Sequence, residues 1–404
     1  MIQNKVIYST AKLMYIFNPD HDLALANFSS TYTPPTSAIK IKTDLQLLPV
    51  WYSGEERVIV NRNADVDFFD DIEKYFNLMP YIISIEDAYK YPAEAIKPWG
   101  WNPSLRRKLL TSGVDEANLP TMDELKMLRQ YSNRSNSVRL LHELKEESRF
   151  YCGDSYYFTE LDRLLDYLQV VGCEDKVLKM PLSGSGKGLI WILGDITDKQ
   201  VDWCRRVISQ QGGIVAEPMF EKVQDFAMEF YLDRGRCRFV GYSLFNTASS
   251  GAYVGNELMS DKNIECRLSE LVEIELLYRL RESLVSKLSV YFADYQGYLG
   301  VDMMVCADRN DSGLSYKIHP CVEINMRMNM GVVAHNFHKS FMYPEGEGIY
   351  NVRYFKRRGD ALKFHEYKKR ESKPVVVEGK IESGYMSLTP VYSDTQYLAY
   401  VLIG

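Results

Sequence analysis

The sequence predicts an α/β protein in which a small parallel sheet precedes larger lobes of mixed α+β structure. Three observations predict it. A chain of 404 residues is too long for one typical hydrophobic core, so two or three packed domains are expected. The first hundred or so residues alternate strand-like and helix-like segments, which is typical of a parallel sheet covered by helices. Later strands follow one another across turns, as in antiparallel hairpins.

Composition and charge narrow the classes of function. Apolar residues make up 46% of the chain and aromatic residues 13%, as in an ordinary globular protein. The net charge is only −6, with Lys and Arg spread along the chain, which argues against nucleic-acid and anionic-membrane partners. No apolar run is long enough to span a bilayer, and the first residues lack a secretory signal. The seven cysteines are odd in number and lack CxxC spacing, so we expect a reduced, cytoplasmic protein without a disulfide framework.

The elements of the first domain follow from short apolar runs. Residues 13–17 and 57–61 are rich in branched and aromatic side chains and predict buried strands. Residues 67–76 carry apolar side chains four apart, which predicts an amphipathic helix. Another helix is expected over 102–113, because an Asn-Pro pair precedes it and a glycine ends it.

Helices and strands alternate less regularly in the rest of the chain. Helices are predicted over 120–131, 136–146, 156–172, 201–212 and 270–292. Strands are predicted over 177–179, 189–193, 213–220, 225–233, 237–247, 298–307, 316–327, 375–384 and 397–403. The charged stretch 363–373 is expected to be a solvated loop or surface face.

A glycine-rich loop separates the strands at 177–179 and 189–193. It consists of Ser183, Gly184, Ser185, Gly186, Lys187 and Gly188. Alternating glycines let the backbone approach phosphate oxygens and direct N–H groups at them. The loop is not a Walker A motif, since Pro181 and Gly188 stand where that motif needs Gly and Ser or Thr. On this segment alone a plain hairpin is favoured, although Lys179 at the strand end could pair with nucleotide phosphates.

A second motif, a pair of acidic strands, is a more specific signal of function than the glycine-rich loop. The predicted strands at 298–307 and 316–327 flank a turn-rich segment, so they predict a β-hairpin. A regular antiparallel register would place Asp302 directly opposite Glu323, with Asn325 on the same face. Opposed carboxylates need a positive partner, and Mg²⁺ commonly takes one or two carboxylates plus substrate phosphates. The alternative is a pair of surface acids, or partners of a buried arginine such as Arg327; the apolar flanks favour the metal.

These motifs together resemble the ATP-grasp superfamily, from about residue 100 to 335. The resemblance lies in their order: the Lys179 strand and glycine flap, an acidic hinge strand, then the Asp302 strand and the Glu323-Ile324-Asn325 strand. It implies two α+β lobes gripping ATP within residues 113–340, with a flap lobe at about 150–217 and a metal-binding lobe at about 225–340. Residues 1–112 would form a pre-ATP-grasp-like α/β domain. Residues 341–404 would pack on the ATP-grasp lobe.

The resemblance also implies roles for single residues. Lys179 would contact the α- and β-phosphates, and flap amides of Ser183, Gly184, Ser185, Gly186 and Gly188 would cover the β- and γ-phosphates. Glu217 would accept from the adenine amino group beside the backbone up to Phe220, and Asp225, or alternatively Gln224, would hold the ribose. Asp302, Glu323 and Asn325 would bind Mg²⁺. Arg134 would lie near the phosphates, and Arg327 would neutralise charge on an acyl phosphate.

Two features depart from the family pattern. Members that resemble D-alanine ligase have an arginine where this chain has Gly300. The cluster Asp20, His21 and Asp22 matches no substrate motif; it could be catalytic or substrate-binding, but helix capping is the favoured role of Asp22.

The function implied by the resemblance is a Mg²⁺-ATP-dependent ligase that joins a carboxylate to an amine. Its partners would be small molecules, an amino acid or a peptide among them, and a homodimer is a common assembly for such enzymes. Two alternatives stay open: a kinase-like phosphotransferase on the same scaffold, and a nucleotide-binding regulatory protein without turnover.

Overall fold

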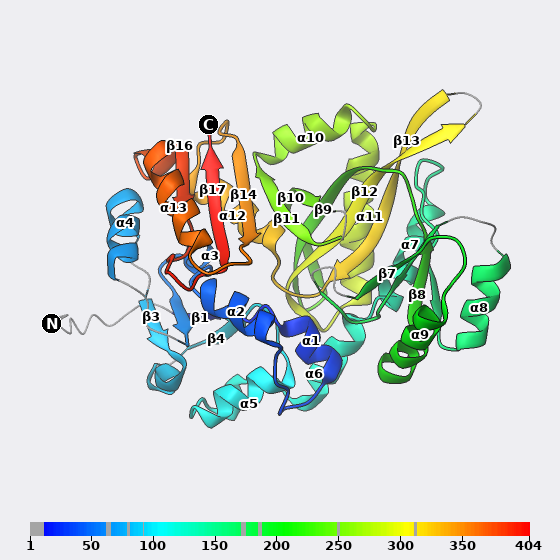
Figure 1. The fold of residues 1–404 in the computed structure, drawn as a ribbon, viewed down its shortest axis with the longest axis horizontal. Coiled ribbons are helices and arrows are strands. Elements are labelled where there is room, and N and C mark those ends of the chain that lie inside the picture. Colours follow the sequence, from blue (N-terminus) through cyan, green and yellow to red (C-terminus); the bar gives the residue numbers. More distant parts are fainter. Residues whose placement is uncertain are drawn as a thin grey trace.

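A computed structural model describes residues 12–61, 66–78, 81–91, 93–170, 175–184, 188–248, 251–310 and 313–404. The strands within these ranges form three sheets, each covered by helices (Figure 1). The first sheet belongs to the N-terminal part, the second to the middle of the chain, and the third joins the C-terminal half into one layer.

The N-terminal sheet is parallel, as the sequence predicted. Its strands lie in the order β3 (Tyr81–Ser84), β2 (Arg57–Val60), β1 (Leu13–Ile16) and β4 (Ala95–Pro98). The helices of this part are α1 (His21–Asn27), α2 (Thr36–Asp44), α3 (Val50–Ser53), α4 (Val66–Phe76) and α5 (Pro103–Thr111), with 3₁₀ turns at Ile85–Lys90 and Glu116–Asn118. Helix α5 begins as predicted, because the Asn102 side chain accepts from the Leu105 N–H at 2.9 Å.

The middle sheet is antiparallel and carries the glycine loop. Helices α6 (Met122–Tyr131) and α7 (Ser135–Lys145) lead to strands in the order β5 (Tyr156–Phe158), β8 (Ile214–Pro218), β6 (Lys176–Lys179) and β7 (Leu189–Ile192). Helices α8 (Leu161–Val170) and α9 (Asp198–Gln211) pack on this sheet. The helix predicted over 156–172 is wrong for its first three residues, which pair with β8 as an edge strand.

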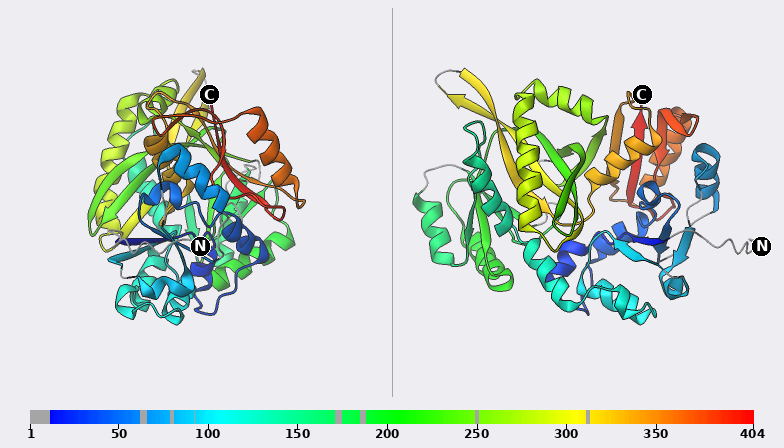
Figure 2. Two further views of the ribbon diagram at one scale, coloured as in Figure 1. Left: turned by 90° about the vertical axis from the view of Figure 1, so that its left-hand side faces the viewer. Right: turned by 180° about the vertical axis from the view of Figure 1, so that it is seen from behind.

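The third sheet has nine antiparallel strands. Their order is β13 (Gly313–Asn325), β12 (Gln296–Asn310), β9 (Lys222–Asp233), β10 (Arg236–Thr247), β11 (Tyr253–Leu258), β14 (Gly348–Tyr354), β17 (Tyr397–Ile403), β16 (Lys380–Ser387) and β15 (Val375–Val377). Its helices are α10 (Asp261–Ser269), α11 (Ile274–Tyr291), α12 (Met330–Phe341) and α13 (Asp360–Glu371). Figure 2 shows α11 and α12 on one face of the sheet, seen from behind.

Two apolar cores hold these layers together. Helix α11 places Leu277, Leu280, Leu284 and Leu288 on one fully buried face against β9 and β10. Burial of each such leucine contributes about 1.5–3 kcal/mol. The second core joins the N-terminal part to the C-terminal strands around Trp51, whose ring packs on Phe337 and whose Nε1 donates to the Leu388 carbonyl at 2.6 Å. The C-terminal strands therefore fix the N-terminal part beside the third sheet.

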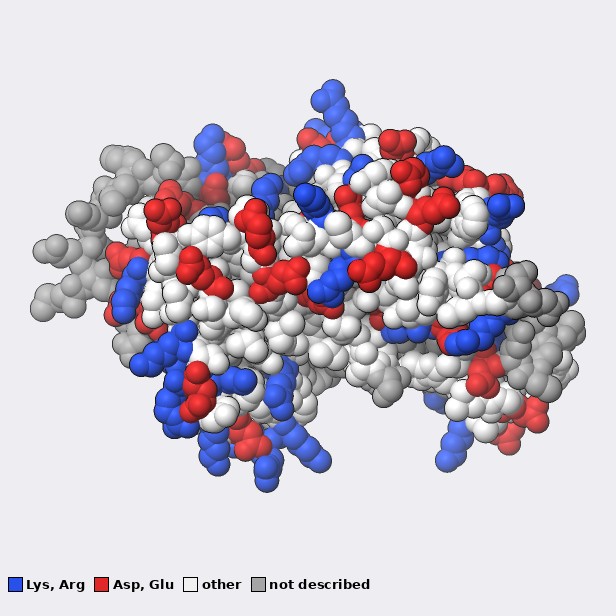
Figure 3. All heavy atoms as spheres, turned by 90° about the horizontal axis from the view of Figure 1, so that it is seen from above, with Lys and Arg blue, Asp and Glu red and all other residues white. Residues whose placement is uncertain are grey.

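Some elements were predicted wrongly or not at all. The charged stretch 363–373 lies mostly in helix α13 rather than in a loop. Helices α10 and α12 and strands β11 and β14 were not predicted, because their patterns are short or mixed. Within the described ranges, no helix combines the length and apolar character needed to cross a bilayer, and all six cysteines there are free. Acidic and basic side chains are interspersed over most of the face in Figure 3.

Candidate active site

A cleft of about 400 Å³ lies where the three parts of the molecule meet. Its walls come from α1 and α2, from the start of the glycine loop, from strands of the nine-stranded sheet, and from the first turn of α12. Asp302, Glu323, Asn325, Arg327 and Gly184 all line it. The cleft therefore brings together residues predicted separately from two motifs.

The predicted pairing of Asp302 with Glu323 is confirmed, although for a different reason than the one predicted. The hairpin turns between Asn310 and Gly313, so a regular register would place Asp302 opposite Cys321. A bulge between Asp302 and Met304 shifts the register, and Asp302 then pairs with Glu323. The Asn325 amide donates to Asp302 Oδ2 at 2.9 Å, so all three side chains share one face.

These three side chains form an all-oxygen donor set. Burial, and next the neighbouring Glu323 charge, raise the pKa of Asp302 to about 7. A cation between the two opposed carboxylates would offset the repulsion that Asp302 meets from Glu323. Among the residues that the structure describes, no cluster of three or more His, Cys, Asp or Glu is arranged to hold a metal. Two carboxylates and an amide fit Mg²⁺ that is completed by substrate phosphates.

Each basic side chain predicted to contact phosphate is paired with an acid. Lys179 Nζ lies 2.5 Å from Glu217 Oε2, and Arg134 Nη2 lies 2.5 Å from Glu323 Oε1. Arg327 Nε contacts both carboxylate oxygens of Asp22, at 2.9 and 3.0 Å. All three cations are mostly buried. Two of the three ion pairs therefore reach the cleft wall, one through Asp22 and Arg327 and one through Glu323, whereas neither Lys179 nor Glu217 lines it.

Arg134 connects the glycine loop to the acidic hairpin. It precedes α7, and its Nη1 donates to Ser183 Oγ at 2.7 Å and to the Met180 carbonyl at 2.5 Å. Gly184, next in the loop, lies so close to Asp22 that a Cβ there would overlap the carboxylate. A Cβ at Gly188 would likewise overlap Ser183, so these two glycines permit close approaches. Ser185 and Gly186 lie outside the described residues.

The side chains predicted for the adenosine lie along β8 and β9. Glu217 is buried, and its Oε1 accepts from Ser155 Oγ at 2.9 Å. Phe220 contacts His319 edge to face with ring centroids 5.5 Å apart, and both nitrogens of the His319 ring lack partners. Asp225 accepts from Thr247 Oγ1 at 2.9 Å and pairs with Lys222. Their roles toward adenine and ribose stay predictions.

The capping role favoured for Asp22 is wrong. Helix α1 begins at His21 after Asp20, whose side chain makes no capping hydrogen bond, and Asp22 turns instead to Arg327. Burial alone would raise the pKa of Asp22, but Arg327 outweighs burial and holds it below its usual value. Asp22 is 305 residues from Arg327 in sequence, so no local pattern could have predicted the pair.

A second buried acid explains the glycine that departs from the family pattern. Glu229 is 1% exposed, and its Oε2 accepts from Asn329 Nδ2 at 2.6 Å. Burial raises the pKa of Glu229 to about 8, so the side chain is mostly protonated at neutral pH. A Cβ at Gly300 would overlap both groups, and any side chain there would displace them. Only the alternation of Glu229 with buried Phe230 signalled that it faces the cleft.

The fold of this chain is similar to that of solved structures, although its sequence is not similar to that of known proteins. The sequence matches no protein-family model and no curated protein. Among solved structures, the biotin carboxylase of Campylobacter jejuni, a complex with β-γ-ATP, aligns over 98% of this chain and 88% of that chain, with 12% identity and a TM-score of 0.53.

A second structure gives the same result. The biotin carboxylase domain of the Hydrogenobacter thermophilus 2-oxoglutarate carboxylase, with MgADP, ADP and bicarbonate, aligns over 97% and 86% of the two chains. Identity is 11% and the TM-score is 0.50. The N5-carboxyaminoimidazole synthetase of Staphylococcus aureus with ADP also aligns, over 98% and 93% at 12% identity, but its TM-score of 0.46 is too low to carry an argument. With this likeness over nearly its whole length, the chain has the ATP-grasp fold that its motifs predicted.

Proposed function

We propose that this protein is a Mg²⁺-ATP-dependent ligase that activates a small-molecule carboxylate as an acyl phosphate and joins it to an amine, releasing ADP and phosphate. The observation that carries the proposal is the opposed Asp302–Glu323 pair on the cleft wall, with Arg327 on the same wall and Arg134 bonded to Glu323. A regulatory nucleotide-binding protein would not need this whole set.

Two of the ion pairs suit an exchange of partners. Lys179 and Arg134 would exchange Glu217 and Glu323 for nucleotide phosphates. Glu323, freed from Arg134, would hold Mg²⁺ together with Asp302 and Asn325. Bound Mg²⁺ supplies positive charge that stabilises the transferring phosphoryl group. Arg327, held in place by Asp22 and Asn325, would neutralise charge on the acyl phosphate.

The proposed reaction has two steps. A carboxylate oxygen of the substrate attacks the γ-phosphorus, and the bond between that phosphorus and the ADP oxygen breaks. The amine nitrogen then attacks the acyl carbon, the bond from that carbon to the phosphate oxygen breaks, and the amine loses a proton. Both steps depend on positioning and charge stabilisation, so no covalent enzyme nucleophile is required.

The alignments support the nucleotide but leave the substrates open. The two carboxylases with TM-scores of at least 0.50 were solved with β-γ-ATP or with MgADP and bicarbonate, and one of them as a domain dimer. Identities of 11–12% carry the fold alone. We extend the proposal to the division into residues 1–112, 113–340 and 341–404, to an amino acid or peptide as one substrate, and to a homodimer.

The test is ADP release with pools of amino acids and dipeptides, with and without Mg²⁺. Asp302→Asn and Glu323→Gln should each lower turnover at least about a hundredfold, a loss of roughly 2.7 kcal/mol in transition-state stabilisation. The matched control is Asp308→Asn: Asp308 is in the same strand but pairs with Lys317 toward the turn of the hairpin, at 2.9 Å. Near-normal turnover of both site variants would refute the proposal.

Hydroxylamine separates ligation from phosphotransfer. It traps an acyl phosphate as a hydroxamate and leaves a phosphate ester unchanged. Hydroxamate formation that depends on ATP and on Asp302 is the expected result. ADP release with a stable phosphorylated product and no hydroxamate would instead show the kinase-like alternative.

A further inference from the structure

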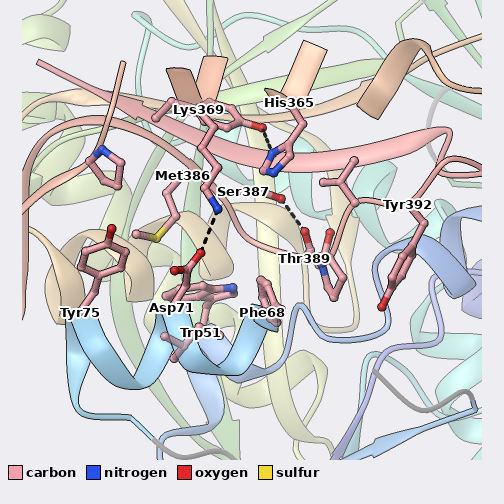
Figure 4. A pocket seen from close by; sticks show the side chains of 15 residues that line it. Trp51, Phe68, Asp71, Tyr75, His365, Lys369, Met386, Ser387, Thr389 and Tyr392 are labelled. Atoms are coloured by element: carbon pink, nitrogen blue, oxygen red, sulfur yellow. Dashed lines mark hydrogen bonds and ion pairs between the residues drawn. The ribbon is translucent and has the colours of Figure 1, made fainter. Parts of the chain in front are cut away.

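A second cavity lies away from the cleft, between the N-terminal part and the C-terminal strands. It has a volume of about 240 Å³ and shares no lining residue with the cleft. Figure 4 shows Trp51 and α4 on one side and α13, β16 and the loop after β16 on the other. The cavity therefore lies at a junction between segments some three hundred residues apart.

Five of the fifteen residues that line it are Trp, Tyr or Phe: Trp51, Phe68, Tyr75, Tyr385 and Tyr392. The Trp51 ring is fixed by its hydrogen bond to Leu388 and by edge-to-face contacts with Phe337 and Phe341. Such walls present flat apolar surface at little cost in conformational entropy. These aromatic walls could therefore pack against a flat apolar ring of a ligand.

His365 gives the cavity a polar side chain that can hydrogen-bond a ligand. The Thr389 hydroxyl has no hydrogen-bond partner, but it is fully buried and is not open to the cavity. His365 Nδ1 contacts the Tyr385 hydroxyl at 3.0 Å, and Figure 4 shows its ring facing the same space. Burial lowers the pKa of His365 to about 4, so the imidazole is neutral at pH 7.

The cavity offers no unbalanced charge among its lining residues. Lys369 and Asp71, on opposite walls, pair with each other at 3.1 Å, and both are about half exposed. A charged ligand would have to break this ion pair or leave its own charge buried without a partner. An uncharged ligand binds without either energetic penalty.

The volume limits the size of the occupant. A cavity of about 150 Å³ accepts one benzene ring, whereas drug-sized ligands occupy about 300–1,000 Å³. The present cavity falls between these values and matches a molecule of two fused rings. We propose that it binds an uncharged bicyclic aromatic molecule with one N–H or O–H group, such as an indole, which hydrogen-bonds to His365.

The experiment uses the full chain and 5-fluoroindole, followed by ¹⁹F NMR. Saturable broadening or shift of the fluorine signal is expected. His365→Phe keeps a flat ring and removes both ring nitrogens, and it should weaken binding about fivefold, the typical worth of one hydrogen bond. Ser37→Ala, on the cleft wall, is the matched control and should leave the titration unchanged.

Three outcomes would overturn the proposal. One is no saturable signal change with the folded native chain. Another is an affinity that His365→Phe leaves unchanged. The third is competition by a non-hydrolysable ATP analogue, which would place the probe in the cleft. A naphthalene probe of equal size should bind more weakly than the indole, because it lacks the N–H group.

Discussion

The cleft and the aromatic cavity are both built between segments far apart in sequence, but they are held together differently. In the cleft, buried charges face one another in pairs, and each charge loses hydration that its partner only partly replaces. In the cavity, neutral rings pack on one another, and the one ion pair is half exposed. Well-packed apolar side chains could replace the buried pairs without loss of stability. We infer that the charges of the cleft are kept for chemistry, whereas the rings of the cavity also hold two parts of the fold together.

The largest effect should follow from removing one half of a buried pair. Arg327→Met leaves Asp22 buried without its cation, so we expect a loss of about 3–5 kcal/mol in the free energy of unfolding. The double variant Arg327→Met with Asp22→Leu should recover most of that stability but no turnover. Urea denaturation measures the first effect and ADP release the second. Recovery of turnover in the double variant would show that the pair is structural only.

An effect of similar size that depends on pH is expected at Glu229. Its pKa is about 8 in the folded chain and near 4.5 when unfolded, so between these values the folded state holds the extra proton. Stability contributed by this group is therefore present below about pH 4.5 and falls as the pH rises to about 8, by about 1.4 kcal/mol per unit. Glu229→Gln should remove this slope.

Thermal melts between pH 5 and 8 check the slope. The variant should melt higher than the native chain at pH 8 and nearly equal to it at pH 5. Parallel curves for the two proteins would mean that Glu229 is ionised in the folded state.

The smallest effect should come from the cavity's ion pair. Lys369→Met removes an exposed partner of Asp71, and exposed pairs contribute about 0.2–1 kcal/mol. Denaturation at low and high salt measures it, and the difference between native and variant should shrink with salt. If Lys369→Met lowered the free energy of unfolding as much as Arg327→Met, the ion pairs of the cleft and of the cavity would not differ in energy as we propose.

The sequence was most informative where a pattern is local. Short apolar runs bounded by glycine predicted β6, β7 and β12, and the turn-rich segment predicted the acidic hairpin. A regular strand register predicted that Asp302 lies opposite Glu323. In the structure this pairing depends on a β-bulge, which no local sequence pattern predicted.

Contacts across long sequence distances could not be predicted. The Asp22–Arg327 and Glu229–Asn329 pairs join segments brought together only by tertiary packing. Helix α13 was not predicted because most of its residues are charged and its apolar face is small, with Ala361 and Phe364. This face is buried only through tertiary contacts with Tyr385 and Tyr400.

The contact between Arg134 and Glu323 has a thermodynamic consequence. While Arg134 holds Glu323, one of the two carboxylates is unavailable to a cation, so Mg²⁺ alone should bind weakly. A nucleotide that draws Arg134 to its phosphates frees that carboxylate. Each ligand then raises the affinity of the other by the same factor, as linkage requires. Calorimetry should thus find little heat with Mg²⁺ alone and tight joint binding with the nucleotide. Arg134→Met should strengthen the binding of Mg²⁺ alone and so reduce the factor by which ATP raises the metal affinity.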